Sequence, residues 1–133
     1  MRFSLYDIPV VEIAESNDPL SLAGNYVVSM AEDTLYKISP NGDNPDNVAI
    51  IDIYNVLPDK SKTIYVVITA DVSANDVNIS CRIEGTIIPA TNWKPGHPPV
   101  RTSSDNREMV LMITNFGNTV NDMACTYILL DSV

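Results

Sequence analysis

The strongest constraint on the fold is an alternation of apolar and polar residues between positions 77 and 84. The run is Val-Asn-Ile-Ser-Cys-Arg-Ile-Glu, in which every second side chain is apolar. Successive side chains of a β-strand point to opposite faces of the sheet. The alternation therefore predicts a strand with one face in the core and the other in water. It also places Cys81 on the apolar face.

The same period of two recurs along the chain, while helical spacing is almost absent. The segment 63–72 is β-branched and apolar on both faces. This predicts a central strand that is covered on both sides or faces a partner chain. Only 18–24, with Asp18 as cap and Gly24 as stop, is expected to form a helical turn. Further strands are expected at 47–54, 107–116 and 123–131, with shorter ones at 3–8, 10–14, 25–30 and 34–38.

Clusters of Asn, Asp, Gly and Pro separate the expected strands at the spacing of a sandwich or barrel. We therefore expect an all-β fold, an antiparallel two-sheet sandwich of the jelly-roll or immunoglobulin-like kind, with about eight or nine short strands. No linker interrupts the chain, and its 133 residues are a common size for one domain. Residues 1–133 are expected to form a single β-sandwich domain.

The charge of the chain restricts its partners. It carries 17 acidic and 8 basic residues, a formal net charge of −9. Such a surface repels phosphates and anionic lipid, so we expect no nucleic-acid partner and no membrane insertion. The N-terminus turns polar before a signal-peptide segment develops, and no apolar run could span a bilayer. We expect cytoplasmic synthesis, with virion association as one setting.

Residues that usually carry catalysis are few. The chain has one histidine, His97, and two cysteines far apart, without a nucleophile motif or glycine-rich phosphate loop. Hydrolysis by Ser or Cys needs a nearby base, and zinc needs three or four ligands at motif spacing. We predict no catalytic residue and no cofactor. Cys81 and Cys125 are expected to be reduced in the core, with a disulfide between strands as the alternative.

The loop 39–47 is dense in oxygen-bearing side chains. Calcium takes several oxygen ligands, and Asn41, Asp43 and Asp46 are the candidates here. The run Asp-Asn-Pro-Asp-Asn at 43–47, followed by an apolar strand, resembles the acidic loop of calcium-dependent bacterial lectins. That resemblance implies calcium-dependent carbohydrate binding. The same residue types also form ordinary turns, and we predict a turn without metal.

The loop 89–101 is the main candidate binding site. It holds the only tryptophan, the only histidine and four of the nine prolines. Trp93, Lys94, His97 and Arg101 are the candidate binding residues, because tryptophan and arginine often dominate interface energy and a tryptophan can stack on a sugar. Prolines stiffen such a loop and lower the entropy cost of docking. The alternative is that Trp93 packs back against the domain.

These observations favour a non-enzymatic structural or assembly protein, such as a virion-associated or capsid-decorating β-sandwich. It would act through protein–protein contacts, as a homo-oligomer or on a larger assembly. The first alternative is a small carbohydrate-binding lectin, and the second is an enzyme without a recognisable motif.

Overall fold

Strands dominate the structure, as the alternation predicted. The computed structural model describes residues 10–13, 16–17, 24–30, 35–39, 48–69, 76–103 and 105–130. The longer strands are β3 (Gly24–Ser29), β4 (Leu35–Ile38), β5 (Val48–Tyr54), β6 (Thr63–Ile68), β7 (Val77–Ile83), β11 (Glu108–Asn115) and β12 (Met123–Leu130). The strand expected at 3–8 and most of the turn expected at 18–24 lie outside the described residues.

Several elements are very short. They are β1 (Val10–Glu12), β2 (Ser16–Asn17), β8 (Thr86–Ile87), β9 (Trp93–Lys94), β10 (Val100–Arg101) and the 3-10 turns η2 (Ala90–Asn92) and η3 (Val120–Asp122). The described residues thus contain twelve strands and not eight or nine. The estimate was low because two-residue strands are too short to show a period. No described helix is long and apolar enough to cross a membrane.

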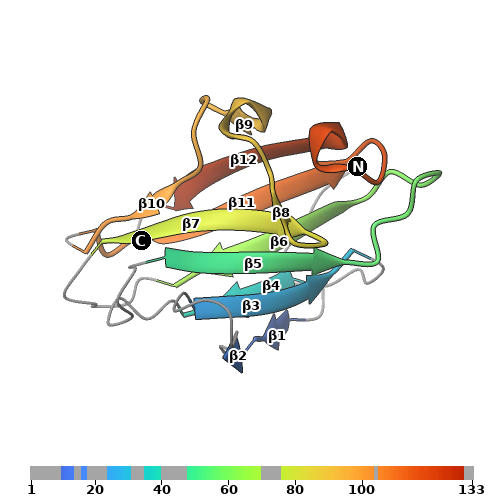
Figure 1. Ribbon diagram of the computed structural model, residues 1–133. Coiled ribbons are helices and arrows are strands. Elements are labelled where there is room, and N and C mark those ends of the chain that lie inside the picture. Colours follow the sequence, from blue (N-terminus) through green and yellow to red (C-terminus); the bar gives the residue numbers. More distant parts are fainter. Residues whose placement is uncertain are drawn as a thin grey trace, which may run out of the picture.

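The strands form two sheets. The first has the order β1-β4-β6-β11-β12-β9, and the second the order β10-β7-β5-β3-β2, with β8 beside β7. Figure 1 shows β3, β5 and β7 lying in front of β4, β6 and β11. A cluster of buried apolar side chains draws on both sheets, including Ile51 and Ile79 from one and Ile64 and Leu111 from the other. The core therefore lies between the sheets.

The sheets are mixed, which corrects the expectation that they are antiparallel. β3 pairs with β5, and β5 with β7, in parallel; β4 and β6 are also parallel. From β3 to β7 the chain enters the two sheets alternately, so neighbours within a sheet are two strands apart in sequence and run the same way. Hydrophobic alternation fixes which face a residue occupies but carries no information on strand direction.

Two strands confirm the expected burial. In β7, Val77, Ile79, Cys81 and Ile83 are buried and the residues between them are not. β6 lies between β4 and β11 and is buried on both faces. Its Val67 packs with Leu35 and Val110 in a second, smaller apolar cluster.

Candidate functional site

The four predicted binding residues do not form one exposed patch. Trp93 is 1% exposed and Arg101 is 3% exposed, whereas Lys94 and His97 lie at the surface. A ring with so little exposure presents almost no face to a sugar or a partner. The structure thus separates the set into two buried residues and two surface residues.

Trp93 is held in the core by β9, which pairs in parallel with β12 and places it opposite Cys125. Its ring centroid lies 6.4 Å from that of Tyr127, at a tilt of 57°. Tilted contacts at this separation are typical of packed aromatic residues. This is the arrangement in which Trp93 packs back against the domain.

The surface residues of this loop lie along β12. The ring of His97 is 6.3 Å from Tyr127, and the hydroxyl of Thr126 donates to the Lys94 carbonyl at 3.3 Å. β9 pairs only with Cys125 and Thr126. In the described part of the chain, no strand pairs with the last four residues of β12 on the side away from β11.

The last four residues of β12, 127–130, are apolar and partly exposed. Ile128 is 47% exposed and Leu130 is 37% exposed. The whole strand, Met-Ala-Cys-Thr-Tyr-Ile-Leu-Leu, contains neither a charged residue nor a proline. Charges and prolines are what natural proteins use to keep edge strands from pairing with other chains. β12 lacks this protection within a chain of net charge −9.

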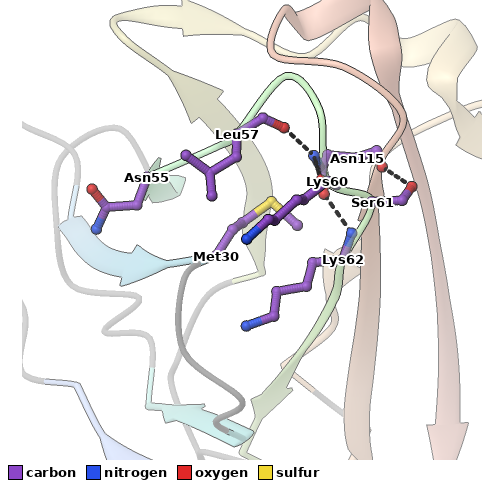
Figure 2. Close-up of a pocket in the computed structure, with 7 residues that line it drawn as sticks. All are labelled: Met30, Asn55, Leu57, Lys60, Ser61, Lys62 and Asn115. Atoms are coloured by element: carbon purple, nitrogen blue, oxygen red, sulfur yellow. Dashed lines mark hydrogen bonds between the residues drawn. The ribbon is translucent and has the colours of Figure 1, made fainter.

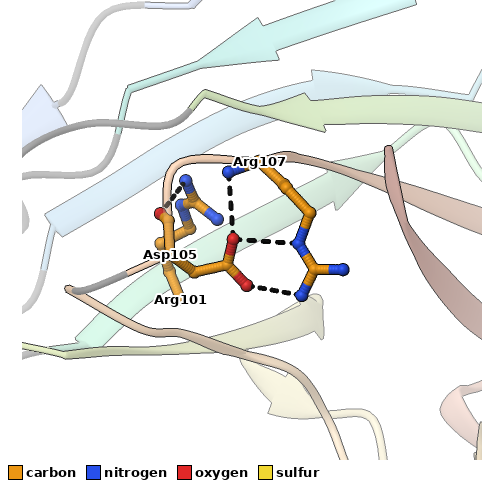
Figure 3. Close-up of polar contacts among 3 residues, drawn as sticks. All are labelled: Arg101, Asp105 and Arg107. Carbon is orange, nitrogen blue, oxygen red and sulfur yellow. Dashed lines mark hydrogen bonds and ion pairs between the residues drawn. The ribbon is translucent and has the colours of Figure 1, made fainter. Parts of the chain in front are cut away.

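Arg101 fixes the end of the loop to the domain. Its Nε donates to the Thr69 carbonyl at 3.1 Å, and its Nη2 to the Asp105 carbonyl at 2.9 Å. The carboxylate of Asp105 accepts two hydrogen bonds from the Arg107 guanidinium and one from its backbone N–H (Figure 3). These bonds from Arg107 hold the pKa of Asp105 well below its usual range. The cluster is a tether and leaves Arg101 buried.

A second feature lies where β5 leads into β6. A cavity of about 410 Å³ opens there, a volume typical of small-molecule sites. Asn115, which is 1% exposed, is one of the residues that line it. Figure 2 shows Lys60 and Lys62 extending from the loop toward the side on which Met30 lies. Asn55, Leu57 and Ser61 also line the cavity.

Asn115 holds the loop that lines this cavity. Its Nδ2 donates to the carbonyls of Leu57 and Lys60 at 3.1 and 2.8 Å, and its Oδ1 accepts from the Lys62 N–H at 2.7 Å. Its backbone N–H donates to the Lys62 carbonyl at 3.1 Å, and its own carbonyl accepts from the Ser61 hydroxyl. One buried amide thus fixes the loop that carries both lysines.

Sequence reasoning missed this cavity, although one signal was present. Asn115 occupies an inward position of β11, in step with Met109, Leu111 and Ile113. A polar residue in a core position needs hydrogen-bond partners, and here it finds them in the loop. Nothing in the sequence indicates that Met30 and Asn55 approach it.

The remaining sequence predictions concern metal and thiol chemistry. Asn41, Asp43 and Asp46 lie outside the described residues. Among the described residues, no group of three or more His, Cys, Asp or Glu is arranged to hold a metal. Cys81 and Cys125 are free and buried, as predicted for a core position. Burial raises the pKa of both thiols, that of Cys125 to about 12.

Comparison with known proteins finds no matching family model, no similar curated protein and no similar solved structure.

Proposed function

We propose that this chain is a non-enzymatic assembly module that pairs the free edge of β12 with the same edge of a second copy. The observation that carries the proposal is the uncharged, proline-free end of β12, which exposes Ile128 and Leu130 beside a backbone edge that no strand in the described part of the chain pairs with. Adding a strand to an open edge is a common mode of protein recognition, in which backbone hydrogen bonds supply affinity and side chains supply specificity.

The sequence of β12 selects a register for this pairing. An antiparallel pair related by a twofold axis through Leu129 places Ile128 opposite Leu130 of the other copy, and Leu130 opposite its Ile128. Both side chains lie on the outer face of the sheet, the face away from the buried Cys125. Pairing limited to residues 128–130 in this register leaves Cys125 and Thr126 paired with β9. The contact is self-complementary, as a twofold interface requires.

Lys94 and His97 border this edge on the β9 side, where they form the polar rim of the proposed interface. Trp93 contributes by holding β9 in place. A dimer of this kind extends the first sheet across two chains and suits a role on a larger particle such as a capsid.

For the fold, we propose a two-sheet sandwich. The apolar cluster shared by the two sheets supports this arrangement. The parallel pairs β3–β5, β5–β7 and β4–β6 distinguish it from the antiparallel jelly-roll and immunoglobulin patterns.

The test is the oligomeric state by analytical ultracentrifugation over a range of concentration and salt. We expect a monomer–dimer equilibrium that strengthens with salt, because salt screens the repulsion between two chains of charge −9. Ile128→Lys introduces a charge at the edge and should weaken association at least tenfold. Val27→Lys is the matched control, since Val27 is 44% exposed on the other sheet. A strictly monomeric wild type, or equal effects of the two variants, contradicts the proposal.

A further inference from the structure

We propose that the loop joining β11 to β12 (Figure 1) is a second contact between copies of this chain, in which the ring of Phe116 of each copy enters a small cavity beside the same loop of the other. Phe116 is the most exposed of the described large apolar residues, at 71%. The contact lies apart from the β12 edge. Asn115 pairs with Met123, and the distance along β12 from Met123 to Leu130 is about 23 Å at ~3.3 Å per residue.

The backbone around Phe116 is fixed by hydrogen bonds within the loop. The Phe116 N–H donates to the Asp122 carbonyl at 2.8 Å, and the Asp122 N–H donates to the Thr119 carbonyl at 3.0 Å. The N–H and the hydroxyl of Thr119 both donate to the Asp122 carboxylate, at 3.2 and 2.8 Å. A Cβ at Gly117 would collide with that carboxylate, so the loop needs glycine there. A ring held on a loop of fixed shape loses little entropy when it docks.

The cavity beside the loop distinguishes Phe116 from the other exposed apolar residues. It has a volume of about 220 Å³ and lies between the loop and the β7–β8 hairpin. A cavity of about 150 Å³ is enough to bind benzene, so this one admits a phenyl ring. Ile83, which is buried, and Val120, which is half-buried, supply its apolar surface. The other described lining residues are Glu84, Thr86, Asn118 and Thr119.

The charge of this lining suits a phenyl ring. Glu84 is the only charged residue in the described lining, and it is exposed. A carboxylate repels anionic ligands, whereas the edge of an aromatic ring carries partial positive charge. The ring thus meets apolar surface at Ile83 and Val120 and the carboxylate of Glu84 at its edge.

The positions of the ring and the cavity identify a second copy as the occupant. Phe116 does not line the cavity of its own chain, yet Asn118, Thr119 and Val120 of the same loop do. Because ring and cavity are neighbours on one loop, a twofold axis beside the loop brings each ring to the cavity of the other chain. The contact is then self-complementary and closes on itself, as a twofold interface requires.

This contact is a weak one. One ring per chain covers much less than the roughly 1,200–2,000 Å² that stable protein interfaces bury. Association through the loop therefore needs high protein concentration, or copies that the β12 pairing already holds together. Because the two contacts lie at different places along β12, one chain can use both and build assemblies larger than a dimer.

The test is made in Ile128→Lys protein, so that its outcome does not depend on the β12 contact. Sedimentation velocity should show self-association of this protein at concentrations up to about 1 mM. Adding Phe116→Ser should weaken the association about tenfold or more, as expected for an aromatic interface anchor. Val27→Ser is the matched control, because it removes an exposed apolar side chain from the other sheet, and it should change nothing. A strictly monomeric Ile128→Lys protein, or equal losses from Phe116→Ser and Val27→Ser, overturns the proposal.

A mixing experiment tests whether the ring itself enters the cavity. Thr86→Arg, in the same background, places a long charged side chain at the cavity and keeps Phe116. Thr86 is exposed, and circular dichroism checks that the variant folds. Alone, it should weaken association as much as Phe116→Ser does. A mixed pair keeps one intact contact, from the ring of the Thr86→Arg copy to the cavity of the Phe116→Ser copy.

Isothermal titration calorimetry of one variant into the other should therefore show binding that is tighter than the self-association of either. A mixture that associates no more tightly than its components overturns the exchange of rings. The β12 proposal is judged separately, by the association that Ile128→Lys removes from the wild type.

Discussion

Two loops that connect strands, 89–101 and 55–62, differ in whether their distinctive residues are buried or line a cavity. The connection at 89–101 has an unusual composition, yet its tryptophan lies in the core and its Arg101 tethers the chain. The connection at 55–62 has ordinary turn residues, yet it lines a cavity of about 410 Å³. The first is anchored by an apolar ring and by hydrogen bonds from the Arg101 guanidinium to the carbonyls of Thr69 and Asp105, and the second by the neutral amide of Asn115. A rare residue type therefore indicates burial at least as readily as binding.

The largest effect is expected where the first connection is anchored. Trp93→Ala removes a large side chain that is 1% exposed and leaves a cavity between β9 and β12. Truncations of this kind cost about 3–5 kcal/mol of the free energy of unfolding, which urea denaturation measures. His97→Ala, at the surface of the same connection, should change stability by less than about 0.5 kcal/mol. Similar losses in the two variants would show that the connection is not anchored by Trp93.

The second connection should lose less stability when its anchor is removed. Asn115→Ala leaves the carbonyls of Leu57 and Lys60 and the N–H of Lys62 without their partner. We expect a cost of about 2–3 kcal/mol, because part of the loop regains water. The exposed Asn118 is the matched control, and Asn118→Ala should be nearly neutral. A neutral Asn115→Ala would mean that the loop holds its shape without the amide.

The long strands could be predicted because their signal is local. The segment expected at 47–54 is β5 (Val48–Tyr54), and that expected at 107–116 is β11 (Glu108–Asn115). Strand direction could not be predicted, since it depends on which sheet the next strand joins. The cavity could not be predicted either. It is assembled from Met30, Asn55 and Asn115, which only the folded chain brings together.

The rate of thiol labelling distinguishes the roles of Trp93 and Asn115. Cys125 lies opposite Trp93, whereas Cys81 lies in the other sheet. Both should react slowly in the native protein, because burial raises both thiol pKa values and the thiolate is the reactive form. Trp93→Ala should accelerate labelling at Cys125 more than at Cys81. Asn115→Ala, which acts at the other connection, should accelerate both equally through global unfolding. Equal acceleration in Trp93→Ala would contradict a local role for β9.

The smallest expected effect is on the pH dependence of stability. It should differ between Asp105, which is a charged carboxylate, and Asn115, which is a neutral amide. The hydrogen bonds from Arg107 hold the pKa of Asp105 well below its usual range. A carboxyl group whose pKa is lowered by folding stabilises the protein above its unfolded pKa, and this contribution is lost as pH falls through the folded value. The stability advantage of the wild type over Asp105→Asn should therefore be constant above about pH 5 and shrink progressively below about pH 4.

The same titration applied to the neutral tether is the control for that comparison. The difference in stability between the wild type and Asn115→Ala should stay constant over this range, because an amide does not titrate. Urea denaturation of the three proteins from pH 6 to pH 2 measures both differences, and subtraction removes the contributions of all other carboxyl groups. A gap for Asp105→Asn that is unchanged at low pH would show that Arg107 does not stabilise the carboxylate. A gap for Asn115→Ala that closes would show that a titrating group also holds the 55–62 connection.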